Sequence, residues 1–527
     1  MKNASKLFVV ALIALMGLTS CFDLISLLLN DNDDPEIGET RNFWAQNFKT
    51  ESHYQVRAEL LYIGSKCKIW VEKGSGVGAD TAKDMANTYD NVVYPRMMDA
   101  FGSRNGLSFN GKVVASDTME FSSWLVDGDG KLTILLLDIK DGYTPSSGAY
   151  TAGYFWAVNH FENIPSHTVY RYSNFCDMIY IDIDPGRAGS KTSNMTLAHE
   201  MQHLMNFVTS IAKRATYTNG ELTALSLMET WVDEGLSAAA EYVYAGEHNM
   251  GRIQWFNGDD EPNERLIGGD NFYVWGNYVD SDPNSILNDY ATVYLFFQWL
   301  RLQSGDGSAI YKDIIESASP DYRAVLGAAK NRISAEYASN WGLLLRDWMA
   351  ANYINAANGT YGYMNDPALK DVQAMVAEGF SSSHHYPLAP GEGIYTQRTT
   401  TSGVTASPKI KLAGLHKSPE QVSDNQAAPG GVLLSYNVDT DTRGDSSYCY
   451  PFPSVEIAGA GPGKNAALSL SRISQGDGGA ARGLYQQPQL PGPYPIGAGD
   501  MLRLNGHSEG LAGLDFARLR GRIEAGE

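Results

Sequence analysis

The chain has 527 residues, of which 43% are hydrophobic and 19% are charged, and this composition excludes disorder along the whole length. Asp and Glu number 60 against 40 Lys and Arg, so the formal net charge is −20. Because an acidic surface repels polyanions, nucleic acid is excluded as an expected partner. By length alone we expect roughly two to four domains.

The N-terminus has the form of a bacterial export signal. Lys2 and Lys6 precede a short apolar run that is too short to span a bilayer stably. The run ends in Leu-Thr-Ser-Cys, which resembles a lipobox in which Cys21 carries the lipid. We therefore predict a lipoprotein signal at residues 1–20 and a location in the bacterial cell envelope, at the outer membrane or the cell surface. A plain secretory signal or an uncleaved N-terminal anchor is the alternative.

An acidic segment follows the signal. Residues 21–40 contain the run Asn-Asp-Asn-Asp-Asp-Pro, which is typical of a solvated tether. No other segment is apolar over the length that a bilayer requires, so the membrane is expected as a partner through the N-terminal lipid alone.

The cysteines are compatible with an oxidising compartment. With Cys21 assigned to the lipid, Cys67 and Cys176 could form a disulfide and Cys449 would stay free, although the spacing does not fix the pairing. The sequence contains no CxxC pair, so a cysteine-based zinc site is not expected.

Alternating and apolar runs predict a sheet in the first part of the chain. Strands are expected over residues 67–72, 131–138 and 177–184. A helix is expected over residues 80–101, ending at Gly102.

Long helical patterns replace the strands over residues 195–355, and a sheet followed by a helical block predicts the α+β class. We expect this mixed N-terminal sheet and helical block to form one domain at 41–360. Short alternating runs, of which 432–438 is the clearest strand, predict a small β-rich module at 361–455. Residues 456–527 are rich in Gly, Ala, Pro and Gln, and we expect them to be disordered.

The sequence His-Glu-Met-Gln-His from His199 to His203 is an HExxH motif within a helical pattern. Residues four apart lie on one helix face, so both imidazoles can reach one Zn²⁺ at about 2.1 Å. Glu200 then points beside the metal, where it can take a proton from a bound water. A helix that merely contains two histidines is the alternative, and it is disfavoured because both lie opposite the apolar stripe of Leu197 and Met201.

A third ligand must come from elsewhere in the chain. Thr209 stands where a three-histidine zincin has its last ligand, so that class is excluded. Apolar residues at helical spacing predict a second buried helix over 225–243. This segment contains three candidate carboxylates, and a solvated face or a hydrogen bond to a histidine is the alternative role of each. These candidates are Glu229, Glu234 and Glu241.

Parts of the chain resemble known peptidases. The sequence Trp-Val-Asp-Glu-Gly at 231–235 resembles the Trp-x-x-Glu-Gly signature of gluzincins, which implies that Glu234 is the third zinc ligand. From about residue 55 to 355 the chain resembles the hyicolysin family of secreted bacterial zinc metallopeptidases. This second resemblance rests on the blocks at 198–207, 229–237 and, less specifically, 290–300. It implies a zincin-like fold, Zn²⁺ as the cofactor and a protein or peptide substrate.

A gluzincin also needs a donor that stabilises the oxyanion. Asp289-Tyr290 resembles the helix start that carries the catalytic tyrosine of aminopeptidase-type gluzincins, which implies this role for Tyr290. A core or capping role is the alternative for this tyrosine. His160, His384 and His385 are weaker candidates, because isolated histidines are more often surface or hydrogen-bonded core residues.

Calcium is a second candidate ion, because secreted zinc proteases often bind it, but no calcium site is assigned. The sequence Asp-Gly-Asp-Gly at 127–130 has two carboxylates and lacks the glutamate that closes a calcium loop, which favours a hairpin turn.

These observations predict a secreted, lipid-anchored zinc endopeptidase with Glu200 as the general base. The alternative is a catalytically inactive surface lipoprotein with a protease-like fold that binds host or envelope polymers. An aminopeptidase is a narrower alternative, and the lack of a Gly-x-Met-Glu-Asn-like run for gripping a free amine favours the endopeptidase. The sequence predicts no oligomeric state.

Overall fold

The computed structural model describes most of the chain between residues 35 and 441, and two residues beyond. The described residues are 35–103, 107–109, 112–114, 130–144, 150–160, 163, 165–166, 168–218, 221–257, 272–275, 286–377, 381–385, 388–397, 408–426, 430–441 and 453–454. Six predicted features lie outside them wholly or in large part: the signal at 1–20, the lipidation site Cys21, residues 21–34 of the acidic tether, the acidic turn at 127–129, Cys449 and the tail at 456–527.

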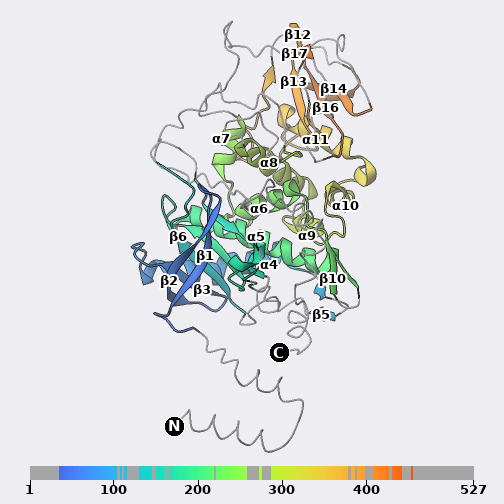
Figure 1. Cartoon of the computed structure of the whole chain (residues 1–527). Coiled ribbons are helices and arrows are strands. Elements are labelled where there is room, and N and C mark those ends of the chain that lie inside the picture. Colours follow the sequence, from blue (N-terminus) through green and yellow to red (C-terminus); the bar gives the residue numbers. More distant parts are fainter. Residues whose placement is uncertain are drawn as a thin grey trace, which may run out of the picture.

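A six-stranded mixed sheet forms the N-terminal part of the fold (Figure 1). In spatial order its strands are β1 (Thr40–Asn47), β2 (Ser52–Ile63), β3 (Cys67–Glu72), β6 (Leu132–Leu137), β8 (Met178–Asp182) and β7 (Gly153–Phe155). The central strands β3, β6 and β8 are parallel, and the outer strands pair antiparallel. β6 is buried along its whole length, as its apolar run predicted. All three predicted strands are confirmed.

The predicted helix over 80–101 is confirmed and contains a wider turn. α3 (Ala79–Thr88) continues through a π-helical turn (Tyr89–Val93) into α4 (Tyr94–Phe101). Pro95 is at the start of α4, directly after this turn, and proline has no N–H with which to continue the regular hydrogen-bond pattern. Gly102 ends the helix, and a Cβ there would lie 2.4 Å from the carbonyl oxygen of Met98.

The helical block is also confirmed, and in Figure 1 it lies between the N-terminal sheet and the C-terminal strands. Its α-helices are α5 (Lys191–Arg214), α6 (Thr230–Ala245), α7 (Met250–Asn257), α8 (Ile286–Ser304), α9 (Ala309–Ile315), α10 (Tyr322–Arg332) and α11 (Trp341–Ile354). Trp231 is central to this block, and its ring packs against the rings of Phe272, Tyr273, Phe296 and Trp341. Short 3₁₀ turns occur at Ala157–His160, Tyr170–Tyr172 and Ala335–Ser339.

The predicted helix over 225–243 is wrong in its first part. Leu225 ends a hairpin formed by β9 (Ala215–Thr218) and β10 (Glu221–Leu225), and α6 begins only at Thr230. Leu225 and Met228 are buried like the helical residues that follow. Their apolar spacing therefore predicted burial correctly, but it did not indicate helical hydrogen bonding. A second hairpin pairs β4 (Leu107–Phe109) with β5 (Lys112–Val114).

A separate five-stranded sheet confirms the β-rich C-terminal part. In spatial order its strands are β11 (Val376–Ala377), β13 (Gly393–Thr396), β16 (Val432–Asn437), β14 (Ile410–Lys417) and β15 (Glu420–Asp424). All pairs except β11–β13 are antiparallel. α11 packs against this sheet, and the Tyr395 hydroxyl donates to the carbonyl of Met349 at 2.8 Å. β12 (Ser381–His385) pairs with β17 (Pro453–Ser454). The fold class is therefore α+β, and the domain boundaries stay predictions.

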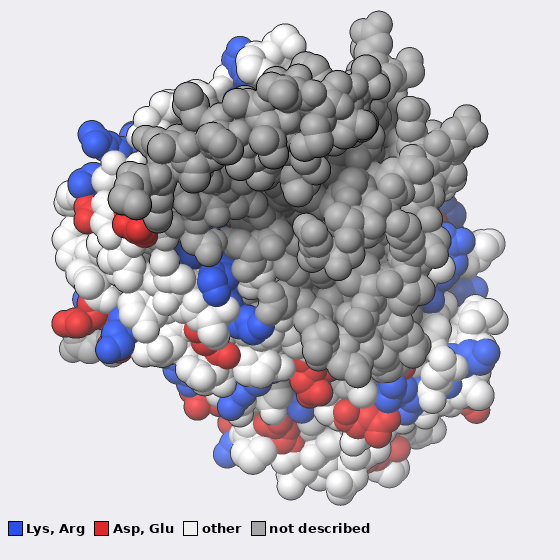
Figure 2. Space-filling view, turned by 90° about the horizontal axis from the view of Figure 1, so that it is seen from below, with Lys and Arg blue, Asp and Glu red and all other residues white. Residues whose placement is uncertain are grey.

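Charges of both signs are present on the surface of the described part. On the face shown in Figure 2, acidic and basic side chains are interspersed. No described helix combines the length and apolarity needed to cross a bilayer.

The disulfide considered between Cys67 and Cys176 is not formed, and both cysteines are free and buried. The Cys67 thiol donates to Asp90 instead, and burial raises the pKa of this thiol.

Candidate metal centre

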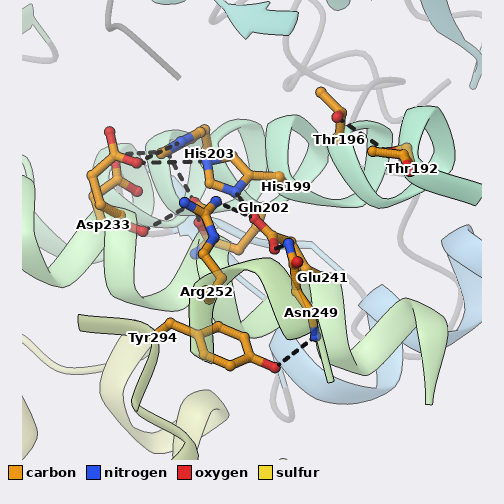
Figure 3. A network of polar contacts seen from close by, with 12 residues as sticks. Thr192, Thr196, His199, Gln202, His203, Asp233, Glu241, Asn249, Arg252 and Tyr294 are labelled. Carbon is orange, nitrogen blue, oxygen red and sulfur yellow. Dashed lines mark hydrogen bonds and ion pairs between the residues drawn. The ribbon is translucent and has the colours of Figure 1, made fainter. Parts of the chain in front are cut away.

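α5 carries a polar stripe although it is buried on all sides over most of its length. The stripe comprises His199, Gln202, His203, Asn206 and Ser210. Its three- and four-residue spacing places these side chains on one face. Buried polar groups require partners, and this face packs against α6. Figure 3 shows His199 and His203 pointing toward Asp233 and Glu241 of α6.

The geometry of α6 places Glu234 opposite the two histidines. Gly235 follows it, and a Cβ at this glycine would lie 2.2 Å from Cε2 of Phe297 on α8. Gly235 therefore permits α6 to pack closely on α8, while the preceding residue, Glu234, faces α5. This contact gives a physical reason for the Glu-Gly pair in the motif.

Three ligand atoms converge between α5 and α6. Glu234 Oε2 lies 3.5 Å from Nε2 of His199 and 3.6 Å from Nε2 of His203. Tetrahedral Zn²⁺ with bonds of about 2.1 Å places neighbouring ligand atoms about 3.4 Å apart. The separations between carboxylate and imidazoles therefore fit a shared zinc ion. Within the described residues, these three form the group of His, Cys, Asp and Glu side chains whose donor atoms could hold a metal.

A carboxylate lies behind His199. Glu241, seven residues after Glu234 and so on the same face of α6, has Oε1 3.2 Å from Nδ1 of His199. A proton on Nδ1 leaves the lone pair of Nε2 directed at Glu234, which is the tautomer that a metal needs. Burial alone would raise the pKa of Glu241, but Arg252 and His199 outweigh it and lower this pKa to about 2.

A second carboxylate lies behind His203 in the same way. Nδ1 of His203 is 3.0 Å from Asp233 Oδ2 and 3.1 Å from Ser237 Oγ. The other Asp233 oxygen accepts from Nδ2 of Asn206 at 2.5 Å, and Arg214 donates to the side-chain oxygen Oδ1 of Asn206 at 3.1 Å. Both histidines are therefore oriented by ionisable partners from α6.

The electrostatics of the site favour a bound cation. Burial raises the pKa of Glu234 well above its usual range, and the nearby carboxylates of Asp233 and Glu200 raise it further. Burial also lowers the pKa of His199 to about 4, so its imidazole is neutral at physiological pH. The neutral imidazole of His199 beside a carboxylate that lacks a full counter-charge matches the requirements of a divalent metal.

Glu200 lies beside the ligand group and is buried. The backbone amide of Phe155, at the end of β7, donates a hydrogen bond to its carboxylate. Burial raises the pKa of Glu200 well above its usual range despite this bond. β7 approaches α5 closely, because a Cβ at Gly153 would lie 2.7 Å from the side chain of Thr196.

Tyr290 also belongs to the site. Its hydroxyl donates a hydrogen bond to Glu234, and its ring lies 6.2 Å from the imidazole of His199. The ring of Trp275 meets it edge-on at 5.0 Å. α8 begins at Ile286, so Tyr290 lies one turn into the helix and not at its start, where the sequence predicted it.

The other sequence candidates have different surroundings. Glu229 precedes α6 and accepts a hydrogen bond from the indole of Trp231 at 3.0 Å. His160 is buried 3.0 Å from Asp177 and packs against Phe155 and Phe207. His384 and His385 are in β12, in the C-terminal part of the chain. Glu241 has the alternative role considered for it, a hydrogen bond to a histidine, here His199.

Sequence reasoning missed Asp233, Ser237, Asn249 and Arg252. Asp233 and Ser237 flank Glu234 by one residue and by three, so helical geometry could have indicated them. Arg252 on the short helix α7 and Asn249 directly before that helix also reach the site, and no local pattern marks them.

The chain was also compared with known proteins. No family model matches it. It is 26% identical over 350 residues to the neutral metalloprotease ShpI of Staphylococcus hyicus, an alignment that covers 65% of this chain and 69% of the relative. This similarity supports the metallopeptidase resemblance of the motifs.

Proposed function

We propose that this chain is a secreted, lipid-anchored, zinc-dependent endopeptidase. The observation that carries the proposal is the convergence of His199, His203 and Glu234 on one point, with Glu200 beside it. The similarity to a neutral metalloprotease supports the same reaction class. Lipid attachment at Cys21 and a place in the cell envelope rest on the lipobox resemblance.

The three ligands would hold Zn²⁺ through Nε2 of both histidines and Oε2 of Glu234. When bound there, Zn²⁺ would supply a Lewis acid and a water whose pKa is lowered toward about 7. Calcium remains without an assigned site.

Glu200 would act as the proton carrier. Its carboxylate accepts the proton of the attacking water and then delivers it to the nitrogen of the leaving amine. The Phe155 amide holds this carboxylate in place, and burial raises the pKa of Glu200, which favours its taking up a proton. We assign Tyr290 as the donor to the oxyanion, because its hydroxyl already reaches the ligand group at Glu234.

β7 is our candidate for the strand that orients the substrate. It is one of the two edge strands of its sheet among the described residues, and its end contacts Glu200 through Phe155. An extended peptide that pairs with β7 would pass beside Glu200, which suits internal cleavage of a chain.

Zinc content and proteolysis together test the proposal. We expect about one zinc per purified chain, cleavage of casein into internal fragments, loss of cleavage with a chelator, and recovery with added zinc. The inactive surface lipoprotein is the second candidate, and it predicts that a zinc-loaded chain leaves casein intact. A chain that cuts casein equally well with and without the chelator would contradict the metal-dependent mechanism.

A further inference from the structure

Two residues from the N-terminal end of α7 bind the carboxylate behind His199. Arg252 Nη2 donates to Glu241 Oε1 at 2.7 Å, and Asn249 Nδ2 donates to Glu241 Oε2 at 2.7 Å. Each oxygen of Glu241 therefore has its own donor, and Oε1 also faces Nδ1 of His199. Figure 3 shows Arg252 and Asn249 pointing toward Glu241.

Arg252 also contacts the second functional side chain of the site. Its guanidinium carbon lies 4.6 Å from the centre of the Tyr290 ring, in the arrangement of a cation–π contact. Arg252 is buried, so this contact and the ion pair with Glu241 are both shielded from water. The Arg252 guanidinium thus holds Glu241, the partner of the zinc ligand His199, and also packs on Tyr290, the candidate oxyanion donor.

α7 is itself held near both ends by a segment from far along the chain. Near its start, His248 lies 2.8 Å from the Tyr294 hydroxyl and 3.0 Å from Asp366 Oδ2. At its end, Asn257 donates to the carbonyl of Asp371 at 2.9 Å and accepts from the amide of Gln373 at 3.1 Å. We call residues 366–373 the α7 clamp.

We propose that α7 is a positioning element of the metal centre. Arg252 and Asn249 are positioning residues that fix Glu241 behind His199, and the α7 clamp fixes the helix that carries them. This inference rests on the proposed zinc peptidase function. According to this inference, the α7 clamp, which follows the helical block in the chain, helps to orient the zinc ligand His199.

Zinc affinity tests the positioning role directly. The dissociation constant is measured by competition with a chromophoric chelator for the parent chain, Arg252→Met, Arg252→Lys and Asn249→Ala. Because partners of this kind tune metal affinity by about 10- to 100-fold, we expect a loss of this size in Arg252→Met. Arg252→Lys keeps the charge and one donor, so part of the affinity should return. Asn249→Ala leaves Arg252 in place and should lose less.

The α7 clamp is tested with Asn257→Ala, which cuts the contacts at the far end of α7 and touches no zinc ligand. We expect a weaker loss of zinc affinity in the same direction. Arg323→Met is the matched control, because Arg323 is exposed and pairs with Asp321 on α10. Its zinc affinity should equal that of the parent.

Kinetics separate positioning from a general loss of structure. With saturating zinc, Arg252→Met should lower kcat for a peptide substrate and leave KM near the parent value, since no substrate contact is removed. If Arg252→Met does not fold, Arg252→Lys and Asn249→Ala carry the test. Parent-like zinc affinity in folded variants at both positions would overturn this inference and leave the proposed function intact. A parent chain that binds no zinc would overturn the proposed function and this inference with it.

Discussion

Gly235 shows how a single missing side chain shapes the metal centre. Its Cα faces the ring of Phe297, and the space available there is less than a methyl group requires. The close approach of α6 and α8 fixes where Glu234 lies and brings Tyr290 of α8 within hydrogen-bonding distance of it. The Glu-Gly pair is thus a packing requirement as well as a chemical one.

Substitution of this glycine should destabilise the fold. In Gly235→Ala the new Cβ would lie 2.2 Å from Phe297 Cε2, so the ring or the helix must move, at a cost of about 1–3 kcal/mol. Gly327→Ala is the matched control, because this helical glycine in α10 has no atom near the added Cβ and alanine should stabilise it by about 0.4–1 kcal/mol. Denaturant unfolding measures both changes. Equal effects of the two substitutions would contradict the packing argument.

At this scale the sequence predicted which candidate ligands lie together better than it predicted their surroundings. The segment from His199 to His203 spans little more than one helical turn. Helix geometry alone therefore predicted that these two histidines and Glu200 lie together. Glu234 required a resemblance, because nothing local reveals that its helix lies against α5. Arg252 was out of reach, since its contact with Glu241 depends on how a separate helix packs.

At the scale of elements, periodic patterns predicted the strands and helices but not every boundary. Leu225 and Met228 continue the apolar spacing of α6, yet they belong to a hairpin and a loop. Periodicity reports which side chains are buried, and a strand end packed on the same core produces the same signal. Several strands were not predicted. β7 and β9 are short and carry few alternating residues, whereas β1 and β2 are long and were missed as well.

The N-terminal sheet contains a histidine on β2 whose titration should affect stability. His53 of β2 stacks on Tyr172 at 4.0 Å and on Trp156 at 5.0 Å. Burial, followed by the charge of Arg171, lowers its pKa from 6.5 to about 4. Between these values the unfolded chain binds a proton that the folded chain does not bind, so His53 makes the fold less stable as pH falls from 6.5 to 4.

Replacement of His53 by Phe keeps a stacked ring and removes the titration. The free energy of unfolding should therefore fall less between pH 7 and pH 4.5 in His53→Phe than in the parent chain. Denaturant unfolding at the two pH values gives the comparison, in which the contributions of all other groups cancel. An equal fall in both proteins would show that His53 titrates normally.

At the scale of the whole molecule, the metal centre joins two helices of the fold. Both histidines are on α5, the helix of the helical block that packs against β7 and β8 of the N-terminal sheet, and Glu234 is on α6, which packs on α8 of the same block. A metal bound by all three would hold these helices together. Stability should therefore depend on the metal as well as on the apolar core.

Removal of zinc should lower the melting temperature. A ligand that binds only the folded state stabilises it by about 2.7 kcal/mol at 100 times its dissociation constant. We expect a chelator to lower the melting temperature of the parent by a few degrees and excess zinc to restore it. His203→Asn should melt at the same temperature with and without the chelator. A chelator effect of equal size in this variant would place the stabilising ion elsewhere.

The sequence predicted the fold class, α+β, but not how distant segments of the chain pack against one another. A sheet, a helical block and β-rich strands follow each other along the chain, and the periodicity of the sequence predicted this order. It did not predict that residues 366–373 contact both ends of α7, because contacts between distant segments produce no periodic pattern. The part of the site that depends on this return was therefore invisible in the sequence.

The central claim is that Glu200 moves the proton in a zinc-dependent peptide hydrolysis. The most direct test is the rate of casein cleavage by Glu200→Gln, measured on a folded sample whose zinc content equals that of the parent chain. Glutamine keeps the size of the side chain and cannot accept the proton, so we predict the parent zinc content with a rate reduced by about 10²- to 10⁴-fold or more. Cleavage at the parent rate by zinc-loaded Glu200→Gln would contradict the account.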